Sequence, residues 1–155
     1  MAPTDLPARG NFPQVKLGKK APKKAEALLI ATFEGESGLE LPGTTLLGGA
    51  ALRSTYEALV AVGASGKVGE VTRVPAPAKA GVASIIAVGL GDAEEVDDET
   101  LRRAAGQAAR SITKVKAVAT SLGDFGVAPV VEGLILGGYK YSGLRSESAA
   151  EATTY

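Results

Sequence analysis

Two short, continuous apolar runs constrain the fold of this chain more than any other feature of its sequence. They cover residues 26–33 and 82–88, and glycine or a charged residue follows each directly. Runs of this length are typical of strands that are buried on both faces of a sheet. Weaker strand patterns cover residues 68–74 and 115–122.

Helical patterns separate these expected strands. The first begins near Thr44 or Thr45, either of which can cap a helix, and it runs to about Val62. The residues expected on its apolar side are Leu47, Leu52, Tyr56, Leu59 and Val60.

Two further helices are expected in the second half of the chain. One begins near Asp97 or Asp98, and the residues it is expected to bury are Leu101, Ala104, Ala105, Ala108 and Ile112. The other opens after Gly126 and runs to about Tyr141. The order strand, helix, strand, strand, helix, strand, helix predicts an α/β fold with three layers. A mixed, mostly parallel sheet is expected at its centre, covered by helices on both faces.

The chain is expected to hold one folded domain between two polar ends. Its 155 residues are the length of one ordinary domain. We interpret residues 1–25 as a basic, proline-containing N-terminal tail that is loosely attached, residues 26–146 as the domain, and residues 147–155 as the start of a linker. The first 24 residues hold six basic side chains and one acid, so a basic tail precedes a body with 11 basic and 16 acidic groups.

The sequence contains no His and no Cys. These residue types supply the commonest general base, the commonest metal ligand and the strongest nucleophile. Any reaction of the whole protein is therefore expected to be carried outside this chain. No apolar run approaches the roughly 18 residues of a membrane span, and the N-terminus lacks the apolar core of a signal peptide. We expect a cytoplasmic protein without a membrane partner.

One candidate binding site is the segment Gly89-Leu-Gly91-Asp92-Ala-Glu94, which follows an expected strand as a dinucleotide-binding turn would. Glu94 replaces the third glycine of that fingerprint, and carboxylates follow it where a phosphate needs bare N–H groups. A tight turn is the favoured interpretation. The acidic run Asp92–Glu99 also lacks the ligand spacing of a calcium loop. Capping and the helix dipole account for its acids without an ion.

Two other features invite a functional interpretation. The lysines of the tail, which are Lys16, Lys19, Lys20, Lys23 and Lys24, are able to contact nucleic acid phosphates, but no aromatic residues alternate with them for stacking. A solvated tail is favoured. Glu132 interrupts a mostly apolar surface of the last helix, and a structural salt bridge or a hydrogen bond to a loop is favoured over catalysis.

Several sequence blocks together resemble one known domain. They are Thr32-Phe-Glu34, Gly66-Lys-Val-Gly-Glu-Val71, Ile86-Ala-Val-Gly-Leu-Gly91, Leu101–Arg110 and Glu132-Gly-Leu-Ile-Leu-Gly-Gly-Tyr-Lys-Tyr141. In this order and with these gaps they are similar to the N-terminal domain of leucyl aminopeptidases, the cytosol aminopeptidase or M17 metallopeptidase family. The resemblance covers about residues 26–146.

The resemblance implies a macro-domain-like fold and a non-catalytic role. In this family a separate C-terminal domain holds two divalent metal ions, zinc or manganese, and removes N-terminal residues from the peptides that it binds. The enzymes are homohexamers, in which N-terminal domains take part in trimer contacts and in access to the active sites. The metal-binding signature Asn-Thr-Asp-Ala-Glu-Gly-Arg is absent here, because Asp92-Ala-Glu94 copies only three of its letters. We therefore predict no catalytic, cofactor-binding or metal-binding residue in this chain.

Two alternatives stay open at this point. The first is a free-standing macro-like module that binds ADP-ribose through Gly48-Gly49 and Gly89–Gly91, although the acids after Gly91 oppose it. The second is a DNA-binding accessory that uses the basic tail, as some bacterial members of the family bind DNA.

Overall fold

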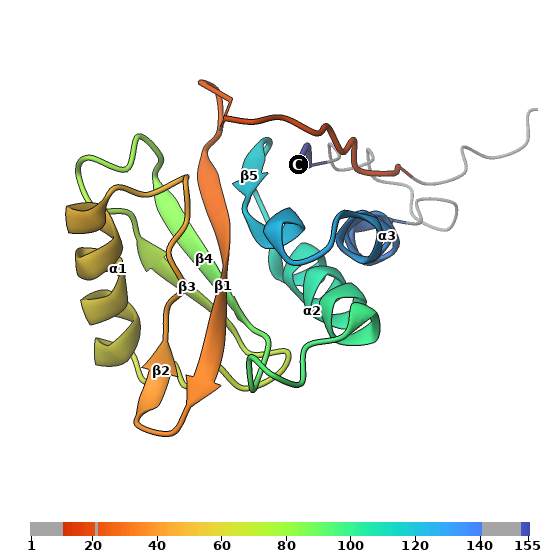
Figure 1. The fold of residues 1–155 in the computed structure, drawn as a ribbon. Helices are drawn as coiled ribbons and strands as arrows, with labels where there is room; N and C mark the ends of the chain where they lie inside the picture. The colour runs from red at the N-terminus through yellow and green to blue at the C-terminus, as the bar shows by residue number, and fades with distance from the viewer. Residues whose placement is uncertain (1–10, 21, 141–152) are drawn as a thin grey trace, which may run out of the picture.

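The computed structural model describes residues 11–20, 22–140 and 153–155. Figure 1 shows a sheet of strands with helices beside it. The strands are β1 (Ala27–Gly35), β2 (Gly38–Glu40), β3 (Val71–Pro75), β4 (Ser84–Gly89) and β5 (Val118–Thr120). The helices are α1 (Gly49–Ala61), α2 (Asp98–Ser111), the short 3-10 helix η1 (Leu122–Asp124) and α3 (Val127–Gly138). The predicted α/β class is confirmed.

β1 is the central strand of the sheet. Its residues Ala27–Thr32 pair in parallel with Ser84–Gly89 of β4. Its other edge pairs in parallel with β5 near its start and antiparallel with β2 near its end. β3 pairs antiparallel with β4. The sheet is therefore mixed, as the sequence predicted, with the order β2-β1-β4-β3 and β5 beside β1. It is not mostly parallel, because two of these pairings are parallel and two are antiparallel.

Alternating side chains of β1 point to opposite sides of this sheet. Leu29 and Ala31 belong to a core cluster with side chains of α2 and α3, whereas Leu28 and Ile30 belong to a cluster that includes side chains of α1. Figure 1 accordingly shows α1 on one side of the sheet and α2 with α3 on the other. Both sides of β1 are covered, which explains why its sequence is an apolar run without alternation.

The structure corrects the prediction for the first helix. α1 begins at Gly49 with Gly48 at its N-cap, and no side chain caps it. Thr44 instead accepts a hydrogen bond from the N–H of Leu46 at 3.2 Å, inside the turn that precedes the helix. The buried face consists of Ala51, Thr55 and Leu59, while Tyr56 and Val60 are 40% and 48% exposed. The predicted burial of Leu47 and Leu59 is confirmed, at 5% and 0% exposed, whereas that of Tyr56 and Val60 is wrong.

Other boundaries differ in smaller ways. The strand expected over 115–122 is only the three residues of β5, and the one expected from Val68 begins at Val71. β2 was not predicted, because its three residues carry too little pattern. The start of α2 and its buried side chains, including Ile112, are confirmed. α3 begins at Val127 as expected, whereas its predicted end at Tyr141 lies outside the described residues.

α2 and α3 pack against each other through glycines. A Cβ at Gly137 would collide with the backbone of Gly106, and one at Gly133 would collide with the carbonyl of Arg102. Glycine in the interior of a helix costs about 1 kcal/mol relative to alanine. The absence of side chains at this crossing compensates by letting the two backbones touch.

Segments from both ends of the chain add to the fold beside β5. Asn11 pairs with Lys140, and Thr154 pairs with both Gln14 and Ala117. Tyr155 is 7% exposed and belongs to the core cluster beneath α2 and α3. This attachment was not predicted, because neither segment has a strand pattern of its own.

Candidate functional site

Ligands of α/β sheets usually bind beyond the carboxyl ends of the parallel strands, which here are the ends of β1 and β4. The Gly89–Gly91 turn lies there. Each of its three N–H groups donates to a backbone carbonyl: Gly89 to Glu70 at 2.8 Å, Leu90 to Thr32 at 2.8 Å, and Gly91 to Gly66 at 2.9 Å. A phosphate needs free N–H groups. This turn therefore holds chain segments together and has no donor of its own left for an anion.

The glycines of this turn are required by close contacts. A Cβ at Gly89 would collide with the backbone at Gly66 and Lys67, and Gly91 has φ of +77°, which disfavours other residues. The Gly-rich signal in the sequence thus reflects the crossing of residues 66–70 over the ends of the two strands. The interpretation as a tight turn is supported over that of a nucleotide site.

Glu70 fills an anion cradle in this region, and sequence reasoning missed it. Its Oε2 accepts hydrogen bonds from the N–H groups of Ser65 and Gly66, both at 2.8 Å, and from the Ser65 hydroxyl at 3.2 Å. Consecutive N–H groups of this kind bind anions in other proteins. Here the chain supplies the anion itself, which closes the loop between α1 and β3.

The acidic run has the structural role that was predicted. Asp97 caps α2: its Oδ1 accepts from the Thr100 N–H and from the Thr100 hydroxyl, each at 2.7 Å. The N–H bond and then the hydroxyl bond from Thr100 lower the pKa of Asp97 below its usual value. Asp92 similarly accepts from the N–H of Glu94 at 2.9 Å. Throughout the described ranges, no group of three or more His, Cys, Asp or Glu side chains is placed to hold a metal ion.

Glu132 forms the predicted salt bridge, but it is not buried. Its Oε2 accepts from Nε of Arg102 on α2 at 2.7 Å, and its side chain is 53% exposed. The carboxylate of Glu99 forms an ion pair with the same Arg102 guanidinium at 2.6 Å and another with Arg103 at 2.7 Å. Hydrogen bonds from Arg103 and then Arg102 lower the pKa of Glu99, and those to Glu132 and then Glu99 raise the pKa of Arg102. The Arg102–Glu132 pair ties α2 to α3, whereas the two pairs of Glu99 lie within α2.

Two hollows mark the described surface. One of about 180 Å³ lies between α2 and α3 and is lined by Arg102, Arg103 and Arg110. The other, of about 570 Å³, lies between β2 and α1 beside Leu52 and Tyr56. Neither brings together a nucleophile and a base within the part of the chain that the structure describes.

The lysines predicted as a candidate nucleic-acid contact are exposed. They are Lys16, Lys19, Lys20, Lys23 and Lys24. Lys16 is tied down through its backbone, because its N–H donates to the carbonyl of Tyr155 at 3.0 Å. Arg9, which is also part of the basic tail, lies outside the described residues.

Comparison with known proteins identifies the family. The model for the cytosol aminopeptidase family N-terminal domain matches residues 32–148. The chain belongs to the cytosol aminopeptidase family. The resemblance found in the sequence blocks is thereby confirmed.

Relatives of this family are similar along most of the chain. A probable cytosol aminopeptidase of Corynebacterium diphtheriae is 51% identical over 142 residues, which cover 92% of this chain and 28% of that protein. A probable cytosol aminopeptidase of Rhodococcus jostii is 40% identical over 144 residues, which again cover 92% of this chain and 28% of that protein. The chain therefore spans a little over a quarter of the length of these curated relatives.

A solved structure shows the same fold. The bottromycin maturation enzyme BotP superposes with a TM-score of 0.55 at 24% identity, over 84% of this chain and 27% of that one. At this identity the likeness concerns the fold alone. Among the described residues, no helix has the length and apolar character needed to cross a membrane.

Proposed function

We propose that this chain is the non-catalytic N-terminal domain of a longer, metal-dependent aminopeptidase that removes N-terminal residues from peptides. The observation that carries the proposal is the family match over residues 32–148, in a chain that spans 28% of its relatives. The absence of the family's metal-binding signature from this sequence supports a non-catalytic role.

The reactive groups are assigned to the remainder of the parent protein. Two divalent ions, zinc or manganese, would be held there and would activate a water molecule and polarise the peptide carbonyl. This chain's own acids support that division, since Asp97, Glu99 and Glu132 are engaged in a helix cap and in ion pairs. The parent is proposed to act in the cytoplasm on peptides that its catalytic domain binds.

Within the parent, the domain is proposed to take part in assembly of a homohexamer and in access to the active site. Its fold is proposed to be the three-layer, macro-domain-like fold of the family, which the placement of helices on both sides of the sheet supports. Exposed apolar side chains on α1 and at its C-cap support a contact role: Tyr56, Val60 and Val62 are 40%, 48% and 61% exposed.

Metal content tests the division of labour. The full-length parent and the 155-residue chain are each loaded with manganese, dialysed and analysed by atomic emission. We expect about two ions per chain in the parent and none in the 155-residue chain. Retention of stoichiometric metal by the short chain would contradict the proposal. Sedimentation of the parent with and without residues 1–155 then tests assembly, and an unchanged hexamer would remove that role.

A further inference from the structure

The segment Thr153–Tyr155 lies as a strand between two other segments of the chain. On one edge the Val118 N–H donates to the Thr154 carbonyl at 2.7 Å, and the Thr154 N–H donates to the Lys116 carbonyl at 2.8 Å. On the other edge the Lys16 N–H donates to the Tyr155 carbonyl at 3.0 Å, and the Tyr155 N–H donates to the Gln14 carbonyl at 2.9 Å. Main-chain hydrogen bonds of Thr154 and Tyr155 thus pair both edges of this three-residue segment.

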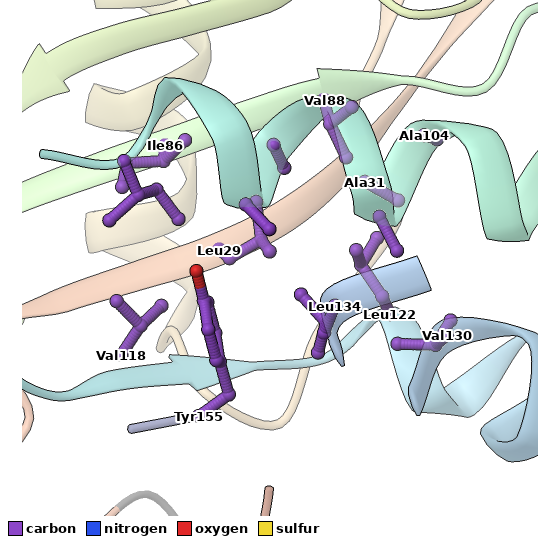
Figure 2. Close-up of a cluster of buried hydrophobic side chains, with 14 of the residues drawn as sticks. Leu29, Ala31, Ile86, Val88, Ala104, Val118, Leu122, Val130, Leu134 and Tyr155 are labelled. Carbon is purple, nitrogen blue, oxygen red and sulfur yellow. The ribbon is translucent and has the colours of Figure 1, made fainter. Parts of the chain in front are cut away.

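The side chains of this segment are also held. The Thr153 hydroxyl donates to the carbonyl of Val115 at 2.9 Å. Tyr155 is 7% exposed, and Figure 2 shows its ring standing among Val118, Leu29 and Leu134. A large aromatic side chain in such a pocket contributes much of the energy of an interface, because it buries a large apolar area with few rotatable bonds.

This arrangement has the two parts of strand addition, the mode by which many domains accept an extended peptide. Main-chain hydrogen bonds supply affinity, and a pocket for a side chain supplies specificity. The slot is formed by residues 14–16 and 115–118, which are about 100 residues apart in the sequence. Gln14 and Lys16 reach the sheet through the inserted strand, so the position of this N-terminal stretch depends on it.

We propose that the slot between Gln14–Lys16 and Val115–Val118 is a strand-docking site that holds Thr153–Tyr155, with Tyr155 as its anchor. Its occupant is this segment of the same chain. When Thr153–Tyr155 is docked, it holds Gln14–Lys16 beside the sheet and fixes the position of residue 155 on the domain. In the longer parent, the same site sets where the polypeptide that follows residue 155 leaves the domain. This last step rests on the proposed function.

Amide hydrogen exchange of the 155-residue chain and its variants tests the docking. In Tyr155→Ala, the N–H groups of Lys16, Val118 and Thr154 are expected to exchange roughly tenfold faster or more, whereas that of Ile86 in β4 changes much less. Thr153→Val keeps the shape and loses only the bond to Val115, so a smaller increase at the same three N–H groups is expected. Tyr155→Phe keeps the ring, so its exchange rates at these N–H groups are expected to stay within about twofold of those in the original chain.

Leu59→Ala is the matched control, since Leu59 is fully buried on the other side of the sheet. This substitution lowers overall stability without touching the slot. It should therefore not speed exchange at those three N–H groups more than at Ile86. Two results would overturn the docking site. One is that Tyr155→Ala speeds exchange at Ile86 as much as at the three slot N–H groups. The other is that neither Tyr155→Ala nor Thr153→Val speeds exchange at those three groups.

The same exchange measurement on the full-length parent tests the exit point. Slow exchange at Thr154 and Tyr155 is expected there too, and fast exchange would show that the longer protein does not use the slot. Because this measurement does not depend on peptidase activity, its failure is distinguishable from failure of the proposed function.

Discussion

Gly137 of α3 lies on the backbone of Gly106 of α2, at the point where the two helices cross. A Cβ at Gly137 would collide with the Gly106 carbonyl and Cα, which are main-chain atoms that no rotamer change can move. The helices can keep this separation only while position 137 carries no side chain, whereas a Cβ at Gly106 would come no closer than 3.4 Å to the Gly133 carbonyl oxygen. The crossing joins the part of the core that holds Leu134 and Ala105, both of them fully buried.

Gly137→Ala is therefore expected to lower the free energy of unfolding by roughly 1–3 kcal/mol, the usual cost of forcing extra volume into a packed core. Urea unfolding measures the change. Gly49→Ala is the control, because nothing lies within 4 Å of a Cβ at that first residue of α1. There we expect a change within about 0.5 kcal/mol or a slight stabilisation. Equal effects of the two substitutions would disprove the contact.

The carboxylate of Glu70 is predicted to hold the loop between α1 and β3. Glu70→Ala leaves the N–H groups of Ser65 and Gly66 without their acceptor, and we expect a loss of about 1.5–3 kcal/mol. Glu70→Gln keeps an acceptor oxygen but not the charge, so less than half of that loss is expected. Urea unfolding of both variants checks this. An Ala variant no less stable than the Gln variant would contradict the role of Oε2.

Much of the fold was predictable, because its central elements have strong local signals. β1 and β4 are continuous apolar runs, and both sides of the sheet that they form are covered. α2 has a clear amphipathic pattern and an Asp at its N-cap. These signals depend only on neighbours in the sequence, so no knowledge of tertiary contacts was needed.

The features that were missed depend on distant contacts. α1 presents Thr55 rather than Tyr56 to the sheet, because the fit of the helix to the sheet decides its buried face. Glu70 is an acid in a weak strand pattern, and nothing local shows that Ser65 and Gly66 will point at it. Tyr155 follows a polar stretch, and its burial comes from pairing with residues far away in the chain. For the acidic run and Glu132, the sequence predicted a helix cap and a salt bridge, but the partners of Glu132 and Asp92 came from the structure.

ADP-ribose is expected not to bind. Its phosphates would need free N–H groups at the ends of β1 and β4, and those of Gly89–Gly91 already donate to backbone carbonyls. Isothermal titration calorimetry should give no heat of binding up to about millimolar ligand, where a binding free energy of about −4 kcal/mol would still be detected. Micromolar affinity would instead support the free-standing binding module.

Tyr155 makes stability depend on pH in the alkaline range. Burial raises the pKa of Tyr155 from 10.0 to about 12. The folded state therefore binds the phenolic proton more tightly than the unfolded state does. The resulting stability is fully present below pH 10 and is lost as the pH rises from 10 towards 12, up to about 2 kcal/mol.

Thermal or urea unfolding between pH 9 and pH 12 checks this against Tyr155→Phe, which cannot ionise. Lysines titrate in the same range in both proteins, so only the difference between the two curves reports on Tyr155. We expect the stability of the original chain to fall more steeply than that of the variant. Parallel curves would mean that the phenol is not buried.

Hydrolysis of leucine p-nitroanilide in the presence of manganese tests the central claim most directly. The full-length parent and the 155-residue chain are assayed side by side at equal molar concentration. The account predicts turnover by the parent and none above the buffer blank by the 155-residue chain. Turnover by the short chain, or a metal-loaded parent that leaves the substrate intact, would contradict it.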